Sequence, residues 1–139
     1  MSHASTVAAD SLSANDLETS LFGDPPANPS VKYAAAMIMA MLDSGEGISD
    51  LIFSPGRPPQ VEKHGRLTAV AIPQVPTLQP EETSRVAREL INGNGAALLA
   101  LREHGACDLS YSLPEHARFR VNVFRQRGTF AIVMRVTRR

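Results

Sequence analysis

The sequence predicts an α+β domain in which helices pack on one face of an antiparallel sheet of about six strands. Three observations lead to this fold class. Segments with helical or strand periodicity follow the order helix, three strands, two helices, three strands along residues 30–139. Short turns join most of the strands, which makes neighbouring strands antiparallel. An alternating stretch near the end of the sequence gives the sheet an apolar face, which needs a cover of helices.

The first 29 residues differ in composition from the rest of the sequence. They are rich in Ala, Ser and Asp, and the stretch ends in the proline-containing run GDPPANPS (residues 23–30). Such segments bury too little apolar surface to fold by themselves. We therefore expect a disordered or weakly helical leader over residues 1–29, with one or two helical turns between residues 13 and 22. The folded domain is expected over residues 30–139.

The first helix of that domain is predicted to start at Asn28-Pro29, where a capping residue precedes a proline at the first helical position. Its apolar residues recur at helical spacing: Val31, Ala34, Ala35, Ile38, Met41 and Leu42. We expect it to end at Gly45 or Gly47. Residues 48–54 are predicted to form a strand, and residues 54–59 a turn forced by prolines and a glycine. Gln60–Lys63 and residues 66–72 are then expected to form a hairpin.

Two helices are predicted in the middle of the sequence. The first begins at Pro80, where Glu81 and Glu82 lie near the positive end of the helix. It ends at the Asn-Gly repeat of residues 92–95. Residues 96–104 are predicted to form a second, short helix, and Ala106–Leu113 a strand.

Residues 117–136 are predicted to form a β-hairpin that turns at Arg127-Gly128. With a two-residue loop, the register pairs Phe119 with Val136, Val121 with Met134, and Val123 with Ile132, so one face is apolar. A four-residue loop gives the same pairing. A three-residue loop would set Phe119 against Arg135, and we reject it because it spoils the apolar face.

The same register places Arg120 opposite Arg135 on the other face of the hairpin. Two unit charges roughly 5 Å apart repel by about 0.8 kcal/mol in water, and like charges opposite one another destabilise a sheet. Two explanations stay open. The side chains extend into solvent or pair with nearby carboxylates, or they are placed to bind an anion such as phosphate, whose oxygens match the planar donors of guanidinium.

Composition and motifs exclude several function classes. The 14 basic and 14 acidic residues give a formal net charge of zero, which argues against bulk nucleic-acid binding. No apolar run is long enough to cross a bilayer, and no Walker A loop is present. His3, His64, His104 and His116 have no metal-ligand spacing with one another or with Cys107, the single cysteine. Nothing marks this chain alone as an enzyme.

Three stretches, in order and at matching spacing, resemble the N-terminal domain of the type IV pilus retraction ATPases (PilT type) of the secretion ATPase superfamily. They are GISDLIFSPGRPPQVEKHGRL (residues 47–67), GACDLSYSLPEHARFRVNVFRQRG (residues 105–128) and FAIVMRV (residues 130–136). The resemblance covers about residues 30–139, and the layout is similar to a Per-Arnt-Sim-like sheet. Two departures are Ile52, where the family has histidine, and Glu62-Lys63-His64-Gly65, where it has Arg-Val-Asp-Gly.

The resemblance implies a domain that precedes a RecA-like motor domain in a homohexameric ATPase of pilus or secretion machinery. Such a motor is cytoplasmic and lies beside an inner-membrane platform protein. Arg120 and Arg135 match two family arginines that stand fifteen residues apart and contact the phosphates of ATP, bound with Mg by the motor domain, in the manner of arginine fingers. Arg118 is a secondary candidate. The alternative is a free-standing, non-enzymatic sensor or adaptor domain of Per-Arnt-Sim type.

Overall fold

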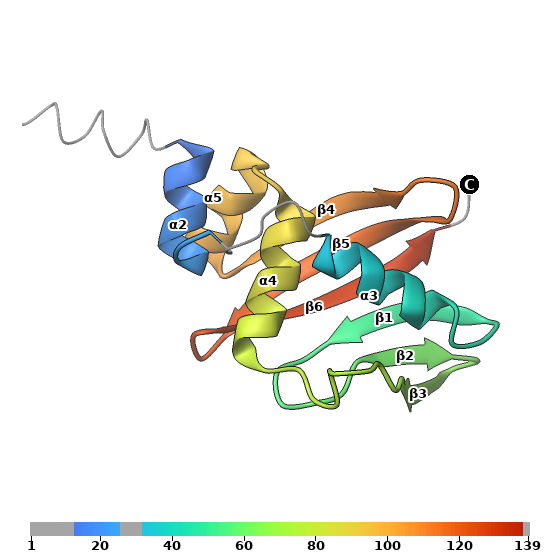
Figure 1. Ribbon diagram of the computed structural model, residues 1–139. Coiled ribbons are helices and arrows are strands. Elements are labelled where there is room, and N and C mark those ends of the chain that lie inside the picture. Colours follow the sequence, from blue (N-terminus) through green and yellow to red (C-terminus); the bar gives the residue numbers. More distant parts are fainter. Residues whose placement is uncertain (1–12, 26–31, 138–139) are drawn as a thin grey trace, which may run out of the picture.

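The computed structural model describes residues 13–25 and 32–137. Within them the chain forms four helices and six strands (Figure 1). The helices are α2 (Ala14–Phe22), α3 (Tyr33–Leu42), α4 (Pro80–Ile91) and α5 (Gly95–His104). The strands are β1 (Ile48–Phe53), β2 (Gln60–Lys63), β3 (Arg66–Ala69), β4 (Ala106–Leu113), β5 (Ala117–Gln126) and β6 (Thr129–Thr137). None of the described helices has the length and apolar character needed to span a membrane.

The strands form one open sheet in the order β3-β2-β1-β6-β5-β4. Every neighbouring pair is antiparallel. The helices lie together on one side of this sheet, with α3 and α4 crossing in front of the central strands (Figure 1). The largest side chains of the core come from both layers and include Phe53, Phe119, Ile38, Met41, Leu51 and Leu98. The predicted α+β fold with a six-stranded antiparallel sheet is therefore confirmed.

The register predicted for the β5–β6 hairpin is the observed one. Gln126 pairs with Thr129 at the turn, and Phe119 pairs with Val136 toward the other end. Arg127 and Gly128 have φ values of 52° and 80°, the left-handed pair that a two-residue hairpin loop needs. Along β5, Phe119, Val121 and Val123 are buried, whereas Arg118 and Arg120 are exposed. One face of the hairpin therefore packs under the helices and the other is left open.

Helix α3 is joined to α4 by a carboxylate. The predicted helix start at Asn28-Pro29 lies outside the described residues, and the described helix begins at Tyr33. Glu89 of α4 accepts hydrogen bonds from the first-turn backbone N–H groups of Ala34 (2.9 Å) and Ala35 (3.1 Å). These amides have no partner within their own helix, so Glu89 acts as their cap. At its other end α3 stops at Leu42, before the glycines predicted to end it.

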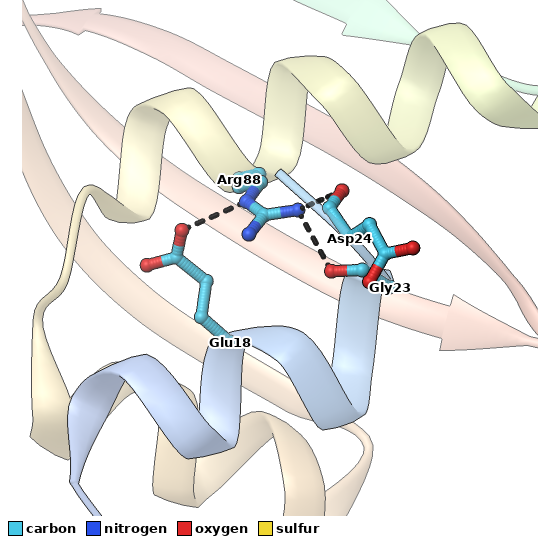
Figure 2. A network of polar contacts seen from close by, with 4 residues as sticks. All are labelled: Glu18, Gly23, Asp24 and Arg88. Carbon is cyan, nitrogen blue, oxygen red and sulfur yellow. Dashed lines mark hydrogen bonds and ion pairs between the residues drawn. The ribbon is translucent and has the colours of Figure 1, made fainter. Parts of the chain in front are cut away.

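Helix α2 packs on the domain, which the expectation of one or two turns in a leader did not include. Its Leu17 is buried in the common core, and the ring of Phe22 packs at a tilt against that of Phe130, with ring centroids 4.9 Å apart. Arg88 of α4 pairs with Glu18 at 2.8 Å (Figure 2). Its guanidinium also donates to the carbonyls of Gly23 and Asp24, the two residues that follow α2, at 3.0 and 2.8 Å (Figure 2).

The remaining predicted elements are present with small shifts at their ends. Helix α4 begins at Pro80 as expected, and the backbone N–H of Gln79 donates to the Glu82 carboxylate at 2.7 Å. Strand β3 ends at Ala69 and not at Ile72, because Ile72 instead forms an isolated bridge with Val75. Strand β1 has an irregularity between Ile48 and Asp50, where the ladder to β2 shifts register.

Candidate functional site

A row of polar side chains crosses the open face of the sheet, one from each of five adjacent strands. In spatial order it consists of Glu62 (β2), Asp50 (β1), Arg135 (β6), Arg120 (β5) and Ser110 (β4), each directly opposite the next. Two acidic residues therefore precede two basic residues along one line. Cross-strand neighbours on one face lie close enough to interact, so the row is one electrostatic unit.

The two arginines of the row are direct cross-strand neighbours, as the sequence predicts. Both are exposed, and the Arg135 side chain retains 72% of its accessible surface. Together with Asp50, Asp108, Val121, Asn122 and Val133, they line a shallow hollow of about 210 Å³ that is open to solvent. A small anionic group could approach both guanidinium groups at once there.

Asp50 explains how Arg135 is placed. Its Oδ2 lies 3.5 Å from Nε of Arg135, an ion pair longer than an ordinary hydrogen bond. One of the two explanations left open by the sequence, pairing with a nearby carboxylate, therefore holds for Arg135. Arg120 has no ion-pair partner among the residues that the structure describes. A carboxylate thus offsets the charge of Arg135 but not that of Arg120.

A second carboxylate lies at the other side of the hollow. Asn122 donates through Nδ2 to Oδ1 of Asp108 at 3.0 Å and to the carbonyl of Cys107 at 3.3 Å. The lining therefore contains two carboxylates and two guanidinium groups, and its formal charge is zero. A neutral hollow open to water holds a free phosphate weakly. The arginines suit an anion that is already fixed by other groups better than an anion bound by this hollow alone.

Arg118 stands apart from the hollow. It lies two residues before Arg120 on the same exposed face of β5 and pairs with Thr137 of β6. Thr137 donates its hydroxyl to the Arg118 carbonyl at 3.1 Å. The guanidinium of Arg118 is exposed but lies outside the lining of the hollow.

A second hollow of about 290 Å³ lies beside α4 and the end of α2, and includes Phe22, Ser84, Arg85 and Arg88. Its cations already have partners, since Arg88 holds α2 and Arg85 lies 4.5 Å above the ring of Tyr33. No cluster of metal-ligating side chains occurs in residues 13–25 and 32–137. Cys107 is buried, and this burial, together with the charge of Asp108, raises the pKa of its thiol to about 11, so it is not a nucleophile at neutral pH.

No protein-family model and no curated protein sequence matches the chain. Among solved structures, it is similar to the pilus retraction motor PilT with bound ADP. The two share 30% identity at a TM-score of 0.59, over 76% of this chain and 29% of the PilT chain. The chain matches the N-terminal domain of a PilT-type secretion ATPase.

Two other solved ATPases share the PilT-type fold. The DotB ATPase of Legionella pneumophila is 22% identical at a TM-score of 0.58, over 84% of this chain and 31% of that one. The VirB11 ATPase of the Brucella suis type IV secretion system is 16% identical at a TM-score of 0.51, over 78% and 31%. This chain therefore spans about three tenths of the length of the ATPases it resembles.

The three stretches that carry the PilT-type resemblance meet at the row on the open face. Residues 47–67 form β1 and β2 and supply Asp50, residues 105–128 form β4 and β5 and supply Arg120, and residues 130–136 lie in β6 and supply Arg135. The sequence pointed to both arginines but not to Asp50. The available signal was a carboxylate beside Leu51, at the strand position that faces away from the apolar side.

Proposed function

We propose that this chain is the N-terminal domain of a motor ATPase of pilus or secretion machinery, and that Arg120 and Arg135 supply positive charge to the phosphates of its ATP. The supporting comparison is the PilT-type match at 30% identity. A RecA-like motor domain holds the nucleotide with its Mg ion, and the N-terminal domain packs against that motor domain.

The observation that carries the proposal is the exposed cross-strand pair of arginines. Adjacent like charges reduce the stability of a sheet. Asp50 offsets the charge of Arg135, but Arg120 beside it has no ion-pair partner among the described residues and calls for an explanation. Phosphoryl transfer supplies one, because negative charge spreads over the phosphate oxygens in the transition state and guanidinium groups stabilise it. The neutral hollow fits this role, since the motor domain binds the phosphate and the arginines only complete its surroundings.

The proposed assembly is that of the PilT-type ATPases. The native protein is a cytoplasmic homohexamer in which the open face of one domain meets a motor domain of the same or a neighbouring subunit. The ring works beside a platform protein of the inner membrane. Arg118, which lies outside the hollow, contacts the neighbouring domain and contributes less to hydrolysis than Arg120 and Arg135.

The test uses the native gene product. Its intact mass should be more than twice the 15.0 kDa of this chain, and it should hydrolyse ATP. We expect the double variant Arg120→Ala/Arg135→Ala to lower kcat by about a hundredfold or more. A matched control is Arg66→Ala, which removes an exposed arginine from the edge strand β3 and should leave kcat unchanged. Undiminished turnover in the double variant, or a native product without a motor domain, would refute the proposal.

A further inference from the structure

Asp50 is the one charged residue that is buried in the described part of the chain, with 7% of its surface exposed. The other buried polar residue, Thr83, donates its hydroxyl to the Pro80 carbonyl of its own helix at 3.1 Å and so has a local partner. A buried carboxylate is costly unless a positive group compensates it. Among the described residues, the ion-pair partner of Asp50 is Arg135.

The ion pair is asymmetric. The side chain of Asp50 retains 10% of its accessible surface and that of Arg135 retains 72%. The carboxylate therefore has little room to move, whereas most of the guanidinium faces solvent. The contact is made through Nε, so the two terminal nitrogens of Arg135 remain able to donate to an outer ligand. A long, flexible side chain is thereby restrained at the inner nitrogen of its guanidinium, while its two terminal nitrogens stay free to donate.

The asymmetry makes the two arginines unequal. Arg135 is flanked by Asp50 on one side and Arg120 on the other. Asp50 offsets the charge of Arg135, whereas Arg120 has no ion-pair partner among the described residues. Of the two arginine charges, the one on Arg120 is therefore left without a compensating carboxylate.

We propose that Asp50 is a positioning residue for the site described above: it holds Arg135 outward, so that Arg135 orients the phosphate while Arg120 supplies the uncompensated charge. This inference rests on the proposed function. Its structural part, the restraint of Arg135 by Asp50, is testable without ATP.

The first experiment measures the arginine Nε–H resonances of this 139-residue chain by ¹⁵N NMR. We expect Arg135 to be ordered and slow to exchange with water, and Arg120 to resemble the exposed Arg66. In Asp50→Asn, Arg135 should become as mobile as Arg66. In Asp50→Glu, the Arg135 side chain should keep part of its order. Glu103→Gln removes an exposed carboxylate from α5, on the side of the sheet that the helices cover, and should leave both arginine resonances unchanged.

Two outcomes would overturn the restraint. One is an Arg135 as mobile as Arg66 in the wild-type chain, a comparison that needs no folded Asp50 variant. The other is an Arg135 that stays equally ordered in Asp50→Asn.

The second experiment is a double-mutant cycle on the ATP turnover of the native protein. We expect Asp50→Asn to lower kcat by about tenfold, with a smaller change in KM, because it misplaces a group needed in the transition state. In an Arg135→Ala background the same change should have almost no further effect, whereas in Arg120→Ala it should keep its full effect. Equal losses in all backgrounds would indicate a merely structural role for Asp50 and overturn the inference. An ordered Arg135 with turnover insensitive to both arginines would instead refute the proposed function.

Discussion

Arg120 of β5 lies directly opposite Arg135 of β6, on the face of the sheet that the helices leave open. The ladder that aligns them also aligns Phe119 with Val136 and Val121 with Met134 on the covered face. Because side chains alternate strictly along a strand, the apolar pairing of the hairpin fixes the arginine pairing as well. The core therefore sets the geometry of the candidate site.

The repulsion between these neighbours predicts that the isolated chain becomes more stable when one of them is neutralised. Arg120→Gln keeps a polar, hydrogen-bonding side chain and removes the charge that has no acidic partner among the described residues. We expect the free energy of unfolding in urea to rise by a few tenths of a kcal/mol at low salt, with the gain shrinking as salt is added. The same substitution at Arg66 should give no such gain. A loss of stability in Arg120→Gln would show that Arg120 makes favourable contacts in the isolated domain.

The contact between Glu89 and α3 predicts a marked loss of stability on substitution. The Glu89 carboxylate accepts from two first-turn amides, Ala34 N–H and Ala35 N–H. Glu89→Gln leaves one acceptor oxygen and removes the favourable charge at a helix N-terminus, and we expect a loss of about 1 kcal/mol in urea unfolding. Glu46→Gln, in an exposed loop, should change stability little. Equal effects of the two variants would contradict the capping role.

The contacts of Arg88 predict that α2 detaches locally when this arginine is replaced by lysine. Arginine uses two separate nitrogens for these contacts, Nε toward Glu18 and Nη1 toward the carbonyls of Gly23 and Asp24. Lysine carries all its donors on one nitrogen, which cannot occupy both positions. In Arg88→Lys, hydrogen exchange should therefore accelerate in residues 14–22 while the β5–β6 hairpin keeps its protection. Uniform acceleration across the chain would mean that Arg88 supports the whole domain and not the attachment of α2.

The two tyrosines predict a loss of stability at high pH. Burial raises the pKa of Tyr33 to about 12, with smaller contributions from the charge of Glu82 and from the hydrogen bond to it. Burial also raises the pKa of Tyr111, together with the charge of Glu89. Both phenol groups therefore keep their protons to a higher pH in the folded state than in the unfolded state. The stability they contribute is present below pH 10 and is lost as the pH rises from 10 toward 12. The chain has no Trp, so phenolate absorbance reports directly on both groups. Titration of both at pH 10 in the folded chain would contradict this account.

The sequence predicted the fold class and the arginine pair because both depend on local periodicity and on one turn. Arg127-Gly128 sets the register, and the register sets which side chains face each other. The contacts that the sequence did not predict join residues far apart along the chain. Arg88 meets Glu18, and Glu89 meets the start of α3, only after the helices have packed. Asp50 was missed for the same reason, since its partner lies on a strand at the other end of the sequence.

The most direct test of the account is a structure of the native protein with a non-hydrolysable ATP analogue and Mg bound. We expect the terminal nitrogens of Arg120 and Arg135 to lie about 3 Å from phosphate oxygens, with Asp50 still paired to Nε of Arg135. A nucleotide-bound structure in which both guanidinium groups face away from the phosphates would contradict it.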